Sequence, residues 1–261
     1  MNPEDPVVAG LLRPQQRPPW LAPLVDNVDQ VPDAYRRRVP PEVLAALTGD
    51  RHAVPGARDA AVLVLFSGPH AESGPDAVPG VVPSDADLLL TVRAGTLRHH
   101  AGQAAFPGGA ADPEDVGPVH TALREAREET GLDPGRLQPL ATLERMFIPP
   151  SGFHVVPVLA YSPDPGPVMV VNESETAIVA RVPLRAFVNP ENRLMVYRSG
   201  GGVRYAGPAF LLNEMLVWGF TGHVISAMLD VAGWAQPWDA ANVRELDEAM
   251  ALVGGDSEGR L

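Results

Sequence analysis

The sequence predicts an α/β fold, a sandwich of helices around a mixed β-sheet. Continuous apolar runs rich in β-branched residues, such as AAVLVLF at 60–66, have the length and composition of buried strands. The segment TALREAREETGL at 121–132 carries apolar residues on one face with the period of an α-helix. Predicted strands and helices do not alternate strictly, which favours a mixed sheet over a fully parallel one.

The elements follow one another along the chain in this order. The first 55 residues are Pro-rich and contain short helical pieces, such as PPEVLAALTG at 40–49. A Gly/Pro/Ser-rich loop at 67–85 and a rigid turn, IPPSGF, separate some of the strands, and Gly131 is placed to end the helix at 121–130. Strands are expected at 60–66, 87–93, 140–147, 154–161 and 176–184, a hairpin at 194–207, and helices at 213–234 and 238–254.

The composition excludes several kinds of chemistry. The chain has no Cys. It has no Lys either, since all 20 residues counted as Lys or Arg are Arg. Thiol nucleophiles, cysteine–zinc sites, Schiff bases and the lysine of phosphate-binding loops are therefore ruled out. The net charge of −12 argues against a nucleic-acid groove. We find no apolar run long enough for a membrane span and no secretion signal, so we expect a cytoplasmic protein.

Three carboxylates share one face of the helix at 121–132. Relative to Glu125, an α-helix places Glu128 and Glu129 at about −60° and +40° around the axis. Like charges at this spacing repel each other. One interpretation is a solvated surface in which Arg124 and Glu128 form an i,i+4 pair. The other is a site for a divalent cation such as Mg²⁺, which prefers oxygen ligands.

The sequence just before this helix favours the cation site. FPGGAADPED at 106–115 contains Gly108 and Gly109, which permit a tight backbone path close to an ion or a phosphate. A Gly-rich turn followed by REAREETGL at 124–132 resembles the signature of the Nudix hydrolases. The first half of that signature differs here, since Val116 stands where its isolated Glu would be, with Asp115 beside it.

A longer upstream motif resembles the coenzyme A diphosphatase subgroup of that family. LLTVRAGTLRHHAGQAAFPGG at 89–109 has the Leu-Leu-Thr, Ala, Arg, Gly and Phe-Pro-Gly-Gly positions of the subgroup motif in step. The resemblance implies a Nudix-type α/β/α sandwich around a mixed β-sheet. It covers residues 56–232 as the Nudix domain, leaving a Pro-rich N-terminal extension at 1–55 and a C-terminal helix and tail at 233–261.

The resemblance also implies roles for individual residues. Glu125, Glu128 and Glu129 would be ligands of Mg²⁺ or Mn²⁺, with the backbone carbonyl of Gly108 as a further ligand. We count Glu128 and Glu129 among the catalytic residues as well. Arg124 is also catalytic in this interpretation, because it would orient the acids through a bidentate contact.

Four further residues complete the predicted site. The family often draws a late carboxylate from a loop after the helix, and NESET at 172–176 offers Glu173 and Glu175. Either could bind metal or act as the general base, and we assign Glu173 as the metal ligand and Glu175 as the catalytic residue. A plain polar turn is the alternative for this segment. Arg98 and Gly109 are expected to bind substrate, with Arg98 placed to contact a phosphate.

The predicted function is metal-dependent hydrolysis of coenzyme A or acyl-coenzyme A to 3′,5′-ADP and a 4′-phosphopantetheine product. One alternative is the same chemistry on another small nucleotide, such as ADP-ribose or a dinucleotide. Another is a non-catalytic nucleotide-binding domain, against which the intact acid triad argues. No nucleic-acid or membrane partner is expected, and a homodimer is left open.

Overall fold

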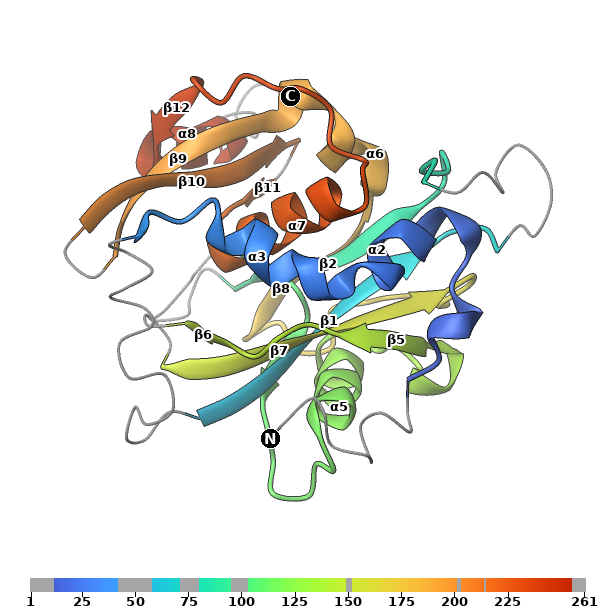
Figure 1. The fold of residues 1–261 in the computed structure, drawn as a ribbon. Coiled ribbons are helices and arrows are strands. Elements are labelled where there is room, and N and C mark those ends of the chain that lie inside the picture. Colours follow the sequence, from blue (N-terminus) through green and yellow to red (C-terminus); the bar gives the residue numbers. More distant parts are fainter. Residues whose placement is uncertain are drawn as a thin grey trace, which may run out of the picture.

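The computed structural model describes residues 12–41, 58–70, 80–94, 103–148, 152–200, 203–213 and 215–254. A large sheet lies at the centre of the molecule, with helices on both of its faces and a second sheet beyond one helix layer (Figure 1). The α/β class and the mixed sheet predicted from the sequence are confirmed. No helix among the described residues is both long and apolar enough to cross a bilayer.

The central sheet is mixed because its middle strand has neighbours of both orientations. β1 pairs in parallel with β7 along its whole length and antiparallel with β2 and β4. Both faces of β1 are covered, which explains why its sequence is a continuous apolar run. The eight strands are β1 (Arg58–Ser67), β2 (Asp87–Arg93), β3 (Ala104–Ala105), β4 (Gly108–Ala110), β5 (Gln138–Thr142), β6 (Met146–Ile148), β7 (Phe153–Ser162) and β8 (Thr176–Pro183).

Helix α5 (Pro118–Thr130) covers one face of this sheet. Val119, Ala122 and Ala126 are fully buried in a hydrophobic cluster that includes inward-facing residues of β1. The helix begins at Pro118, whose missing N–H costs nothing there, and ends at Gly131, which adopts the left-handed conformation (φ 71°). Burial of this face leaves the acidic face of α5 along the rim of the sheet.

The other face of the central sheet is covered by helices from both ends of the chain. α2 (Ala22–Asp26) and α3 (Val31–Arg36) lie beside α7 (Gly219–Val231) (Figure 1). Trp20 is fully buried here, and its ring lies 6.3 Å from that of Phe66 and 6.0 Å from that of Trp234. The described part of the Pro-rich N-terminal segment thus packs into the main core, while the predicted domain boundaries stay a prediction.

A second, four-stranded sheet and the C-terminal helix lie beyond α7. Its strand order is β11–β10–β9–β12, and α8 packs on it through a small separate hydrophobic cluster. The remaining elements are β9 (Arg193–Gly200), β10 (Val203–Leu212), β11 (Met215–Val217), β12 (Val243–Glu245), α6 (Leu184–Val188), α8 (Leu246–Gly254) and the 3₁₀ turns Pro14–Gln16, Pro19–Leu21, Val28–Gln30, Pro134–Arg136 and Pro190–Asn192.

Three predicted elements were wrong in their extent. The single helix at 213–234 is a strand, β11, followed by α7, because 215–217 pair with β10 and Trp218 is extended before Gly219. The helix at 238–254 begins only at 246, after β12 has paired with β9. The strand at 140–147 is interrupted at 143–145 and forms β5 and β6. The helix predicted at 40–49 lies almost entirely outside the described residues.

Candidate active site

The acidic face of α5 turns towards the Gly-Gly strand β4. Glu129 is partly buried, and its Oε2 accepts a hydrogen bond from the backbone N–H of Gly108 (3.1 Å). Glu125 is also partly buried and lies against Gly109. Glu128 is exposed. The structure therefore brings the two predicted glycines and two of the three predicted carboxylates into direct contact.

Gly108 is required by this close approach, whereas Gly109 leaves the space that the Glu125 carboxylate occupies. Gly108 and Gly109 pair with Val62 and Ala61 of β1, and β4 also packs against α5. A Cβ atom on Gly109 would lie 2.5 Å from Oε2 of Glu125, and one on Gly108 would lie 2.4 Å from the carbonyl oxygen of Ala61. No side chain fits at either position without displacing its neighbour.

Arg124 is the centre of the hydrogen-bond network beside these acids. Its Nη1 donates to Oε1 of Glu125 (2.9 Å) and Oε2 of Glu128 (3.2 Å), and its Nη2 donates to the carbonyl oxygen of Ala110 (2.9 Å). The bidentate contact expected of Arg124 is made with Asp115, through Nε–Oδ1 (3.2 Å) and Nη2–Oδ2 (3.0 Å). Arg124 thus ties the acid face of α5 to the loop before the helix.

Asp115 was not predicted to be a site residue, yet it anchors this network. It is buried, and beyond Arg124 it receives hydrogen bonds from Oγ1 of Thr121 (2.9 Å) and the N–H of Asp112 (2.9 Å). Nδ1 of His120 lies 2.7 Å from its Oδ1. Although burial alone would raise the pKa of the Asp115 carboxyl, these hydrogen bonds hold it well below its usual range.

The two inner carboxylates of α5 have the opposite electrostatic character. Burial is the largest cause that raises the pKa of Glu129 to about 7, and the nearby charges of Glu125 and Glu175 raise it further. Burial is also the main cause that raises the pKa of Glu125, against the opposing effect of Arg124. Negative charge at this end of the sheet is therefore only partly neutralised by the protein itself.

The structure distinguishes the two late carboxylates of the NESET turn. Both are exposed, but the charge of Glu175 acts on Glu129, and the Glu175 carbonyl accepts a hydrogen bond from the N–H of Ala94 (2.9 Å). The turn is shaped by Asn172, whose Oδ1 accepts from the N–H of Ser174 (3.1 Å). The backbone of Glu175 is thereby fixed at the end of β2, and its charge is among those that raise the pKa of Glu129.

The donor chemistry of this cluster fits a divalent cation of the Mg²⁺ class. Within the part of the chain that the structure describes, no three His, Asp or Glu side chains already converge at metal-binding distance. Glu125 instead contacts Arg124, and Glu129 contacts the Gly108 N–H. Carboxylate oxygens are the ligands that Mg²⁺ and Mn²⁺ prefer, and a cation would relieve the unneutralised charge on Glu125 and Glu129.

Two predicted features remain outside this geometry. Arg98 lies outside the described residues, as does the stretch 95–102 of the upstream motif. The Gly108 carbonyl stays a predicted ligand, since the contact observed at this residue uses its N–H.

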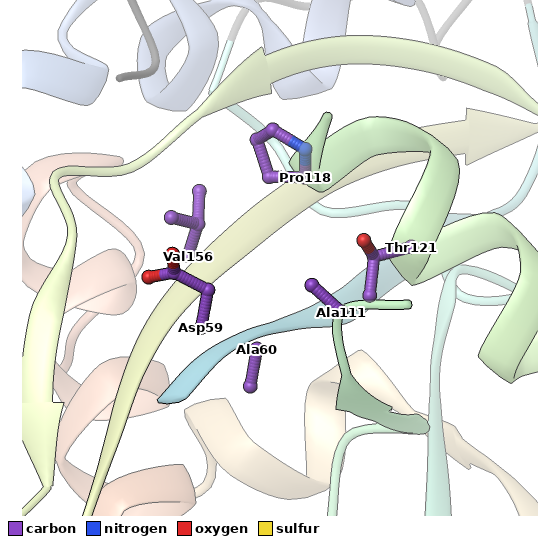
Figure 2. Close-up of a pocket in the computed structure, with 6 residues that line it drawn as sticks. All are labelled: Asp59, Ala60, Ala111, Pro118, Thr121 and Val156. Carbon is purple, nitrogen blue, oxygen red and sulfur yellow. The ribbon is translucent and has the colours of Figure 1, made fainter. Parts of the chain in front are cut away.

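A small pocket lies between the first turn of α5 and the strands β1 and β7 (Figure 2). Its volume of about 10 Å³ is that of a single water site. It is therefore far too small for a nucleotide. Its lining consists of Asp59, Ala60, Ala111, Pro118, Thr121 and Val156.

The chain is similar in sequence to known proteins of one family. The family model described as NUDIX domain matches residues 75–197. The uncharacterized Nudix hydrolase NudL of Photorhabdus laumondii is 35% identical over 148 residues, which are 57% of this chain and 78% of that protein. NudL of Yersinia enterocolitica is likewise 35% identical over 148 residues, covering 57% of this chain and 75% of that protein.

Solved structures of Nudix proteins also match parts of the chain. The crystal structure of RenU, a Nudix hydrolase from M. smegmatis, is 25% identical, covers 49% of this chain and 72% of that one, and has a TM-score of 0.36. A MutT/nudix family protein from Enterococcus faecalis is 17% identical, covers 77% and 78% of the two chains, and has a TM-score of 0.39. From the sequence relatives, the chain belongs to the Nudix hydrolase family and is a diphosphate-bond hydrolase.

Proposed function

We propose that this Nudix hydrolase is a coenzyme A diphosphatase, which hydrolyses coenzyme A or acyl-coenzyme A to 3′,5′-ADP and a 4′-phosphopantetheine product. The observation that carries the proposal is the motif at 89–109, whose first part forms β2 and whose last part is the Gly-Gly strand of the acid site. A motif that leads directly into the site is well placed to select the substrate.

In this proposal Glu125, Glu128 and Glu129 hold Mg²⁺ or Mn²⁺, and the Gly108 carbonyl stays a further candidate ligand. The metal would neutralise the diphosphate and lower the pKa of the attacking water. Arg124 fixes the carboxylates, because its own donors are already bound to Asp115, Glu125 and Glu128.

Glu175 is the proposed general base. Its charge helps to raise the pKa of Glu129, and this supports a place for Glu175 near the acid face of α5, where a general base is needed. Glu173 on the same turn is kept as the alternative late ligand. Gly109 contributes by leaving the space that Glu125 occupies.

The experiment is a substrate panel with saturating Mg²⁺ or Mn²⁺. Coenzyme A, 3′-dephospho-coenzyme A, ADP-ribose and a dinucleotide all contain the diphosphate, so metal contacts alone cannot separate them. We expect the highest kcat/KM for coenzyme A, with 3′,5′-ADP as a product. Equal or better turnover of ADP-ribose would refute the coenzyme A assignment and leave the diphosphatase chemistry intact.

The same panel tests the predicted role of Arg98. Loss of a charge-assisted hydrogen bond to a phosphate reduces affinity by about ten- to a hundredfold. If Arg98 binds the 3′-phosphate, Arg98→Ala will reduce kcat/KM for coenzyme A and leave the 3′-dephospho form almost unaffected. A uniform reduction over all substrates would instead indicate a contact with the diphosphate.

A further inference from the structure

An anionic enzyme without lysine must meet the substrate diphosphate with arginine as well as metal. Arg124 is the obvious cation at the site, but it is not available. All three of its guanidinium nitrogens already donate to Asp115, Glu125, Glu128 or the Ala110 carbonyl. Freeing one of these donors would release the acid face of α5 from its anchor. Another cation is needed to contact the substrate.

Arg93 lies where such a cation would be useful. It is the last residue of β2, and its own N–H donates to the carbonyl of Gln103 (3.1 Å). The next N–H, that of Ala94, donates to the carbonyl of Glu175 (2.9 Å). The pairing of β2 with β8 shifts between Val92 and Arg93, a bulge of the kind that redirects side chains beside active sites. The Arg93 backbone is therefore held at the junction of β2, the NESET turn and the strand leading to Gly108.

The Arg93 side chain also has unused hydrogen-bonding capacity near the acids. Its positive charge lowers the pKa of Glu129, opposing the effects of Glu125 and Glu175. Its Nε is buried and has no hydrogen-bond partner among the described residues. A buried donor on a charged group is costly to leave unpaired, so such atoms commonly mark the place of a ligand or an ordered water.

We propose that Arg93 binds the non-bridging oxygens of the substrate diphosphate. The planar guanidinium fork matches a phosphate and keeps its charge at any physiological pH. In this arrangement Arg93 contacts the substrate, and Arg124 holds the carboxylates in place. This inference rests on the proposed function, since it assumes a diphosphate substrate at this site.

The test compares Arg93→Gln and Arg93→Lys with Arg127→Gln. Arg127 is exposed on α5, and its replacement removes the same charge without touching the network described above. Binding of α,β-methylene-ADP, a diphosphate that cannot be hydrolysed at its bridge, is measured by calorimetry with saturating Mg²⁺. We expect Arg93→Gln to weaken binding by about ten- to a hundredfold and Arg127→Gln to leave it nearly unchanged.

Arg93→Lys distinguishes a loss of substrate binding from a loss of folding stability. It keeps the charge but loses the fork, so we expect an intermediate affinity with an unchanged Tm. Equal affinity of Arg93→Gln and Arg127→Gln for the analogue would overturn the proposal. So would a loss of Mn²⁺ affinity as large as the loss of analogue affinity, because Arg93 would then only organise the acids. An unmodified enzyme that binds the analogue through Arg93 but hydrolyses no coenzyme A would instead contradict the proposed function alone.

Discussion

Replacing Glu129 by Gln should make the metal-free protein more stable at pH 8. The ordinary pKa of a Glu side chain is near 4.5, and that of Glu129 is raised to about 7, chiefly by burial. The folded state therefore favours the protonated form. Its stabilising effect is fully present below about pH 4.5 and is lost as the pH rises through about 7. At about 1.4 kcal/mol per pH unit, ionisation of Glu129 costs the folded state at most about 3 kcal/mol at pH 8.

The assay is urea unfolding of both proteins in EDTA at pH 5 and pH 8. Gln has nearly the same shape as Glu but does not ionise, so the variant should gain up to about 3 kcal/mol over wild type at pH 8 and much less at pH 5. Glu128→Gln is the matched control, since Glu128 is exposed on the same helix and an exposed pair contributes about 1 kcal/mol or less.

Adding Mn²⁺ should reverse the order of stability at pH 8. A cation that binds only the folded state stabilises it by an amount that grows with concentration, and the variant lacks one proposed ligand. A Glu129→Gln protein that is less stable than wild type at pH 8 without metal would refute the electrostatic argument. An equal response of both proteins to Mn²⁺ would refute the ligand role of Glu129.

Three other substitutions test the rest of the network. Asp115→Asn should lower the unfolding free energy by about 3 kcal/mol or more, because it removes the carboxylate that binds Arg124. In the wild-type protein, the stabilisation that Asp115 provides should be lost only in strong acid, since the pKa of this carboxyl is lowered. A stable variant with normal kcat would show that the anchor is dispensable. Gly109→Ala should reduce kcat/KM while the far-ultraviolet circular dichroism stays unchanged, because the new Cβ would lie 2.5 Å from Glu125 Oε2. Glu175→Gln should remove the acidic limb of the pH–rate profile, whereas Glu173→Gln should retain it; two unchanged profiles would exclude both as the base.

The sequence predicted best what depends on neighbouring residues. The period of α5 and its end at Gly131 are local features, and the structure has both. The predicted Gly-Gly turn was wrong, because Gly108 and Gly109 pair with β1 and form the strand β4. The run at 215–217 was misassigned because an apolar stretch suits a buried helix and a buried strand equally well. Its pairing with β10 is what makes it a strand.

The parts of the site that sequence reasoning missed depend on contacts between segments. Asp115 stands beside Val116, where this sequence differs from the expected signature, and only the fold shows that Asp115 forms the bidentate contact with Arg124. Glu173 and Glu175 looked equivalent in the sequence, whereas the fold couples Glu175 to Glu129. Arg93 became a candidate only through the fold, which shows the register shift at the end of β2 and a buried Nε without a hydrogen-bond partner among the described residues.

The buried position of Trp20 makes the core depend on segments that are synthesised far apart in time. Its ring contacts Phe66 and Trp234, so the site that receives it is incomplete until the last of these has left the ribosome. The acid cluster, from Arg93 to Glu175, comes from the middle of the chain and emerges earlier. The cluster around Trp20 therefore cannot be complete during synthesis until Trp234 has been translated, although Phe66 and Tyr161 already offer partial contacts. Until then this large ring is an exposed apolar surface of the kind that makes folding intermediates prone to aggregation.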